Sequence, residues 1–189
     1  MIWNHNFKSL TILLPIIVVV FVLYYTGAKG PYLLDDFGIL DSNAKLSLTD
    51  LSPSGLYEAI FSTKSGPLYR PVSMASFALN YYLAGNTDPF SIKLTNILIH
   101  LFNTMGIFLL TLLLLSSSEN PWLAHPHPTP PLEGEGNSLS LRERVRVGVG
   151  VGVAMFITAL WSLHPLHVST VLYSVQRMTE LASLFCLYS

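Results

Sequence analysis

The chain has 189 residues, of which 51% are hydrophobic and only 11% are charged. Soluble domains carry about 25% charged residues, so this composition excludes an ordinary soluble domain and indicates an integral membrane protein in contact with lipids. The net charge of −1 lacks the basic excess of a nucleic-acid-binding protein, so no nucleic-acid partner is expected. A single cysteine excludes a disulfide within the chain.

The first apolar run, at residues 9–26, predicts a transmembrane helix that is retained in the mature protein. Lys8 precedes it, and Tyr24 and Tyr25 end it, as aromatic residues do at a membrane interface. The run is long for the core of a signal peptide, and the cleavage motif after it is weak. A cleaved signal is therefore the less favoured alternative.

Residues 27–91 are predicted to form one large loop outside the membrane. No segment of this loop is apolar for about 18 residues, which a span requires. Short apolar patterns at 56–61 and 72–83 predict helices at the membrane surface or against the bundle. Pro53 and Pro71 predict where these helices start, because proline is tolerated in a first turn.

Residues 92–115 predict a second span with a polar stripe. Lys93, Asn96, His100 and Asn103 are spaced by three or four residues and therefore share one helix face. Polar side chains at this depth are expected to face the bundle interior or a wet cavity. They either serve a function or form hydrogen bonds between helices.

The segment 116–148 is predicted to be a disordered cytoplasmic insertion. Proline, glycine, glutamate and arginine dominate its sequence, HPHPTPPLEGEGNSLSLRERVRVG, so it offers little to pack. It resembles the translated interspersed DNA repeats of some bacterial genomes. The alternative is a native flexible loop, in which His125 and His127 are not expected to bind metal.

The last segment is predicted to hold a third and a fourth span, at about 149–163 and 168–189. Pro165 separates the two spans, because proline lacks the backbone donor and disfavours helix at the preceding residue. The fourth span has no polar exit, so the chain is expected to be truncated within it. The predicted fold is an all-α polytopic membrane bundle of about four transmembrane helices. Its three segments are 1–115, 116–148 and 149–189.

Charge predicts the orientation of this bundle. The positive-inside rule places the N-terminus and the arginines of the insertion in the cytoplasm. The large loop 27–91 and the turn between the last two spans then share the extracytoplasmic side.

Two pairs of candidate functional residues lie on that outer side. Asp35 and Asp36 follow the first span directly, where an acidic pair suits a general base or a divalent-metal contact. Neighbouring residues of an extended chain point apart, so one of the two is expected to face a site. His164 and His167 are expected to contact hydrogen-bonding or anionic groups, since Pro165 disfavours the regular helix that a metal-binding pair would need. The alternative for the aspartates is a solvated loop with a helix-capping aspartate, and the alternative for the histidines is a position at the membrane interface without a functional role.

Two arginines are candidate anion contacts. Arg177 lies about ten residues into the fourth span beside Gln176, and its planar fork suits a phosphate. The alternative is a structural pair with Glu180, three residues further on the same face. Arg70 in the outer loop is the second candidate, with a solvated surface position as its alternative.

Four blocks in order resemble the N-terminal part of the GT-C superfamily of membrane glycosyltransferases. They are DDFGILDSN, RPVSMASFALNYYLAG, NILIHLFN and HPLHVSTVLYSVQRMTELASLF. The resemblance is strongest to bacterial relatives of the transmembrane-and-TPR O-mannosyltransferases, and it covers the chain outside the insertion. It places the protein in the bacterial inner membrane.

The resemblance implies transfer of a sugar from a polyprenyl-phosphate donor to an acceptor, a protein hydroxyl or a glycan, on the extracytoplasmic face. Asp36, or less favoured Asp35, would be the catalytic base or contact a divalent metal, the one candidate cofactor. The donor and its phosphate would be contacted by Arg70, His164, His167 and Arg177.

The chain departs from this family in its insertion and in ending where the family continues into more spans and tetratricopeptide repeats. An incomplete transferase is therefore expected. The alternative is a non-catalytic membrane fragment or scaffold.

Overall fold

The computed structural model describes residues 3–63, 70–86, 88–116 and 141–189. All regular secondary structure in these residues is helical, which confirms the all-α prediction. Two described helices, α1 and α4, are long and apolar enough to cross a membrane. Helix α1 comprises Trp3–Ala28, and α4 comprises Pro89–Ser116.

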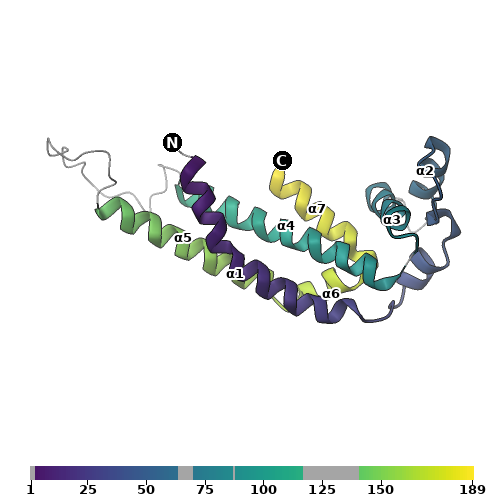
Figure 1. Ribbon diagram of the computed structural model, residues 1–189, viewed down its shortest axis with the longest axis horizontal. Coiled ribbons are helices and arrows are strands. Elements are labelled where there is room, and N and C mark those ends of the chain that lie inside the picture. Colours follow the sequence, from purple (N-terminus) through teal and green to yellow (C-terminus); the bar gives the residue numbers. More distant parts are fainter. Residues whose placement is uncertain (1–2, 64–69, 87, 117–140) are drawn as a thin grey trace.

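Long helices lie side by side and form the body of the molecule (Figure 1). Helix α4 is antiparallel to α1, because Phe108 packs near Leu13 at one end and His100 lies against Tyr24 nearer the other. Helix α5 (Leu141–Ser162) runs back along α4. Helix α7 (Arg177–Tyr188) follows α4 in the parallel direction.

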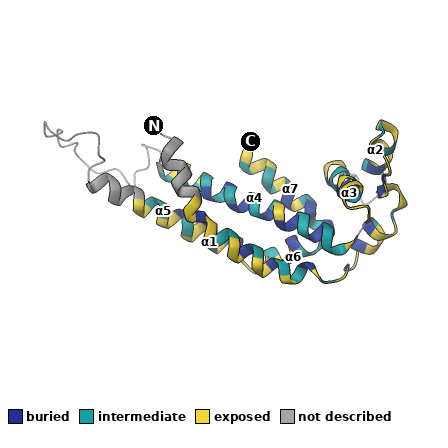
Figure 2. Ribbon diagram, viewed as in Figure 1, coloured by how far each residue is buried: buried dark blue, intermediate teal, exposed yellow. Residues whose placement is uncertain are grey.

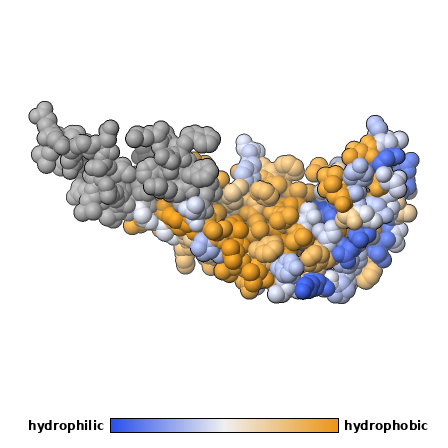
Figure 3. Space-filling model, in the orientation of Figure 1, coloured by the Kyte–Doolittle hydropathy of each residue, from blue (hydrophilic) through white to orange (hydrophobic). Residues whose placement is uncertain are grey.

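The outward surface of these helices is apolar. Exposed large side chains on α1 include Leu14, Val18, Val22 and Leu23, and a hydrophobic band covers the middle of the body (Figure 3). The buried residues instead lie where helices face one another (Figure 2). A helix that is apolar on all sides suits a core or a membrane, and here its outer side meets no other part of the described chain.

The described residues of the large loop, 27–63, 70–86 and 88–91, form a small packed unit at one end of the body (Figure 1). It contains α2 (Pro53–Ile60) and α3 (Pro71–Ala84), whose starts at the two prolines are confirmed. Short helical turns η1 (Phe37–Asp41) and η2 (Ala44–Leu46) precede them. The unit has an apolar core that Ile92 of α4 completes; its other members are Tyr32, Leu40, Leu46, Leu48, Ala59, Met74, Phe77 and Ala78.

The polar stripe of α4 faces inward, as its spacing predicts. Lys93, Asn96, His100 and Asn103 are all buried, with at most 2% exposure. Each of them donates to or contacts a group on another segment of the chain. Hydrogen bonds and close polar contacts with other segments of the chain therefore account for where these four side chains lie.

Two expected boundaries differ from the structure. Helix α5 begins at Leu141, inside the predicted insertion 116–148, whereas 117–140 lies outside the described residues together with His125 and His127. The stretch 168–189 is divided into α6 (His167–Leu172), η3 (Ser174–Gln176) and α7.

The division at Tyr173 has a tertiary cause. Tyr173 is extended, with φ −86° and ψ 106°, so local helical hydrogen bonds are lost around it. Asn96 Nδ2 donates to the carbonyl oxygens of Val171, at 3.1 Å, and Ser174, at 3.3 Å. Side chains of distant segments thus satisfy backbone groups that a continuous helix would satisfy itself.

Candidate functional site

Asp36 ties the large loop to the break in the C-terminal helices. Its side chain is completely buried. Oδ1 accepts a hydrogen bond from the Val175 backbone N–H at 2.9 Å, and Oδ2 accepts one from the Leu33 N–H at 3.2 Å. Both oxygens of the carboxyl group are thus engaged by backbone donors, which are strong partners for a carboxylate.

Asp35 points the other way and is exposed. Its backbone N–H donates to the Tyr173 hydroxyl at 3.2 Å, which holds the aspartate beside the same break. The preceding Leu34 has a left-handed backbone, φ 46°, and an 82% exposed side chain. The structure therefore makes Asp35 the accessible carboxylate of the pair, whereas the sequence resemblance favoured Asp36 slightly for the catalytic role.

Two further polar groups define the surroundings of Asp36. Burial, and then the negative charge of Asp36, raise the pKa of Tyr32 well above its usual range, so its hydroxyl remains protonated. Lys93 Nζ donates to the carbonyl oxygens of Gly30, at 2.9 Å, and Pro31, at 2.7 Å. Two side chains thus hold the segment that follows α1. Lys93 binds its carbonyl oxygens, and Asp36 binds the Leu33 N–H.

An apolar groove opens beside Asp35, with a volume of about 570 Å³. The end of α1, the turn after it and α6 form its walls, and Tyr173, which bonds Asp35, is one of the lining residues. Lys93 is the one basic residue of the lining. The other lining residues are Gly27, Gly30, Pro31, Leu33, Leu34, Pro165, Val168, Ser169 and Leu172.

Arg177 is completely buried, and protein groups receive its guanidinium donors. Its side chain also lies over the Phe77 ring, with Cζ 4.2 Å from the ring centroid. The acceptors are Asn96 Oδ1 at 2.7 Å, Asn80 Oδ1 at 3.0 Å, the Ile92 carbonyl at 2.9 Å, and Ser76 O and Oγ at 3.2 and 3.4 Å. In this state Arg177 joins α3, α4 and α7 and offers no donor to an external phosphate. Neither does it use the predicted partner Glu180, which lies in a different cluster.

The other predicted contacts do not gather around Asp35. Arg70 starts α3 in a left-handed conformation, φ 47°, and is partly buried. His164 is exposed, and its Nδ1 accepts the Leu166 N–H of its own turn at 3.3 Å. His167 points instead to α4, where its ring centroid lies 5.2 Å from that of His100.

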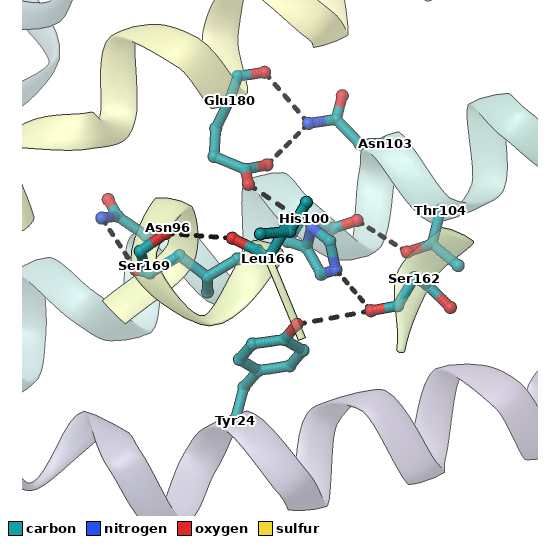
Figure 4. A network of polar contacts seen from close by, with 10 residues as sticks. Tyr24, Asn96, His100, Asn103, Thr104, Ser162, Leu166, Ser169 and Glu180 are labelled. Carbon is teal, nitrogen blue, oxygen red and sulfur yellow. Dashed lines mark hydrogen bonds and ion pairs between the residues drawn. The ribbon is translucent and has the colours of Figure 1, made fainter. Parts of the chain in front are cut away.

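A second polar cluster lies deeper in the body, around His100 (Figure 4). His100 Nε2 lies 3.1 Å from the Ser162 carbonyl oxygen, and Nδ1 lies 3.4 Å from Glu180 Oε1. Asn103 Nδ2 donates to Glu180 Oε2 at 2.7 Å and to the Glu180 carbonyl at 3.0 Å. This cluster connects α4, the end of α5 and α7.

Aromatic rings surround the cluster. The His100 ring stacks on Trp161 at 5.3 Å between centroids, and Tyr24 meets its edge at 5.2 Å. His167 lies 4.4 Å from the Trp161 ring. Among the described residues, His100, His167 and Glu180 form a group that could hold a metal ion, because each offers a ligand atom within 4.8 Å of the others.

Sequence reasoning identified only part of this cluster. It placed His100 and Asn103 on an inward face and noted Glu180 as a polar residue inside an apolar helix, but the one partner it offered for Glu180 was Arg177. The available signal was Glu180 itself, a carboxylate within an apolar stretch. Trp161 and Ser162 carry no such signal, because apolar helices commonly contain both types of residue.

Comparisons with known proteins give no family for this chain. No family model matches it, and neither a curated protein nor a solved structure matches it significantly. Within the residues that the structure describes, the fold and the site define an all-helical protein with two candidate membrane spans and two buried polar clusters.

Proposed function

We propose that the protein is embedded in a bacterial inner membrane and acts in transferring a sugar from a polyprenyl-phosphate donor to an acceptor. In this proposal α1, α4, α5 and the α6–α7 segment enter the membrane, the N-terminus is cytoplasmic and the loop 27–91 is extracytoplasmic. The apolar outer surface of the helices supports the membrane setting. The sequence resemblance to GT-C glycosyltransferases supports the reaction class.

One observation carries this proposal: an exposed carboxylate lies beside an apolar groove at the end of the bundle. The groove offers an apolar surface to the first isoprene units of a lipid-linked donor. Asp35 would take the proton of the attacking acceptor hydroxyl. Lys93 in the groove lining, whose ammonium keeps a third donor besides those bound to Gly30 and Pro31, would stabilise the phosphate leaving group. Asp36 would hold Asp35 in place rather than take the proton.

The test uses the full chain in lipid nanodiscs with polyprenyl-phosphate mannose labelled in the sugar. Donor binding and transfer to a serine- and threonine-containing peptide are measured separately. We expect Asp35→Asn to bind the donor as wild type does but to transfer label about 100-fold or more slowly, as loss of a general base would cause. Asp41→Asn removes another exposed carboxylate of the same loop and is expected to leave both readouts unchanged.

Two outcomes would contradict the proposal. One is a wild-type chain that binds the labelled donor no better than it binds free polyprenol. The other is transfer that survives at the wild-type rate in Asp35→Asn. A chelator in the same assay separates a base from a metal-holding carboxylate, because only the latter loses transfer when divalent ions are removed.

A non-catalytic membrane scaffold is the second candidate function. The observation that favours it is that Arg177 and the stripe on α4 use their polar groups to join helices. A scaffold predicts no donor binding under any condition of the assay above.

A further inference from the structure

We propose that His100, His167 and Glu180 bind one divalent transition-metal ion, of which Zn²⁺ is the best-suited example. The three ligands come from α4, the start of α6 and α7, so the ion would fasten the two C-terminal helices to α4. This site is separate from Asp35 and the groove, and the proposal does not depend on the transferase function.

The hydrogen bonding of His100 points to a cation. Its Nε2 faces a carbonyl oxygen, that of Ser162, at 3.1 Å (Figure 4). A carbonyl can only accept, so Nε2 carries a hydrogen. In the neutral ring Nδ1 then holds a lone pair, and this lone pair lies 3.4 Å from Glu180 Oε1.

Two acceptors that face each other in a buried site repel unless a positive species lies between them. His100 is completely buried, and its Nδ1 has no hydrogen-bond partner, since the 3.4 Å approach to Glu180 lacks hydrogen-bond alignment. The positive species is either a proton on Nδ1 or a metal ion. A proton would need a hydrogen bond to Glu180, whereas a metal ion needs a third ligand, and His167 supplies one.

The supporting contacts are those of a metal site. Ligating histidines commonly donate their second ring N–H to a backbone carbonyl, and ligating carboxylates are themselves hydrogen-bonded. His100 donates to the Ser162 carbonyl, and Glu180 Oε2 accepts from Asn103 at 2.7 Å. These contacts orient Nδ1 and Oε1 toward each other.

The spacing fits a small tetrahedral ion. Ligand atoms about 2.0–2.1 Å from Zn²⁺ lie about 3.4 Å apart, which is the distance between His100 Nδ1 and Glu180 Oε1. The three ligand atoms lie within 4.8 Å of one another, so closure to a spacing of about 3.4 Å requires a shift of up to about 1.4 Å. His167 is only partly buried and can make it. Two imidazoles favour Zn²⁺ or Co²⁺ over Mg²⁺ or Ca²⁺, which prefer oxygen ligands.

The test titrates CoCl₂ into the chelator-treated full chain in detergent. We expect one Co²⁺ per chain, with the intense visible absorption of a tetrahedral centre, and loss of that absorption when ZnCl₂ displaces the ion. His167→Ala and Glu180→Gln are each expected to weaken binding at least 100-fold. Asn103→Ala, which removes a supporting contact, is expected to weaken it 10- to 100-fold.

His164→Ala is the matched control, because this exposed histidine lies in the same turn and its imidazole accepts a hydrogen bond from the Leu166 N–H, outside the proposed ligand group. It is expected to bind Co²⁺ as wild type does. Glu180→Gln nearly preserves the shape and the acceptor for Asn103, so its loss of binding can be measured in a folded chain. Failure of wild type to bind Co²⁺ or Zn²⁺ saturably would overturn the proposal and assign the position to a proton. Equal binding by wild type and His167→Ala would overturn it too.

Discussion

The contact between Asp36 and Val175 can be tested by the substitution Asp36→Asn. The side chain keeps its shape, but one carboxylate oxygen becomes an amide NH₂. Asn can accept only one of the two hydrogen bonds that Asp36 accepts, from Val175 at 2.9 Å and from Leu33 at 3.2 Å. The other backbone N–H would then face an amide donor in a completely buried position.

The expected cost follows from the two bonds. Exchanging a charged for a neutral acceptor costs about 1 kcal/mol, and a buried donor without a partner costs about 1–3 kcal/mol. The free energy of local opening at the contact between Asp36 and Val175 should therefore fall by about 2–4 kcal/mol. The equilibrium constant for opening then rises by about 30- to 1,000-fold.

Hydrogen exchange of the full chain in detergent measures this opening. The amides of 173–176 should exchange faster in Asp36→Asn by that factor, with little change in the amides of α1. Asp35→Asn is the matched control, because its exposed carboxyl should change stability by less than about 0.5 kcal/mol. If the Val175 amide exchanges as slowly in Asp36→Asn as in wild type, the stabilising role of the hydrogen bond between Asp36 and Val175 is refuted.

Three further substitutions test the packing. Arg177→Lys leaves several buried acceptors without a donor, including Asn80 Oδ1, because one ammonium cannot reproduce the planar guanidinium fork. The free energy of unfolding measured in SDS titrations should therefore fall by about 2–5 kcal/mol. A Cβ at Gly27 would collide with the Leu172 side chain, so Gly27→Val should cost about 1–3 kcal/mol in the same titration, and adding Leu172→Ala should recover part of it. Leu34→Gly should raise the thermal unfolding temperature slightly, because it removes the backbone strain of a left-handed leucine, about 1–2 kcal/mol, at little loss of packing. A lower unfolding temperature would contradict this expectation.

The helices and their inward faces were predictable because they depend on local sequence. Apolar runs long enough to span a bilayer locate α1 and α4. Proline fixes the first turns of α2 and α3, and the spacing of Lys93, Asn96, His100 and Asn103 fixes one shared face.

The partners of these residues were not predictable, because they depend on contacts between distant parts of the chain. Asp36 and Val175 are 139 positions apart, and Arg177 and Asn80 are 97 apart. Periodicity identifies the side of a helix that is buried, but it does not identify which group lies opposite. The burial of Asp36 beside an exposed Asp35 therefore could not be predicted from the sequence, and the alternative that paired Arg177 with Glu180 differs from the structure.

By itself, the sequence determined an all-α chain, two apolar helices and the inward stripe of α4, since propensity and periodicity act over a few residues. Only the tertiary structure decided that the C-terminal stretch breaks at Tyr173 and that Glu180 turns to His100 and Asn103. It also decided that Asp36 is buried while Asp35 is exposed. The physical reason is that each buried polar group must find a partner, and that partner exists only once the helices have packed.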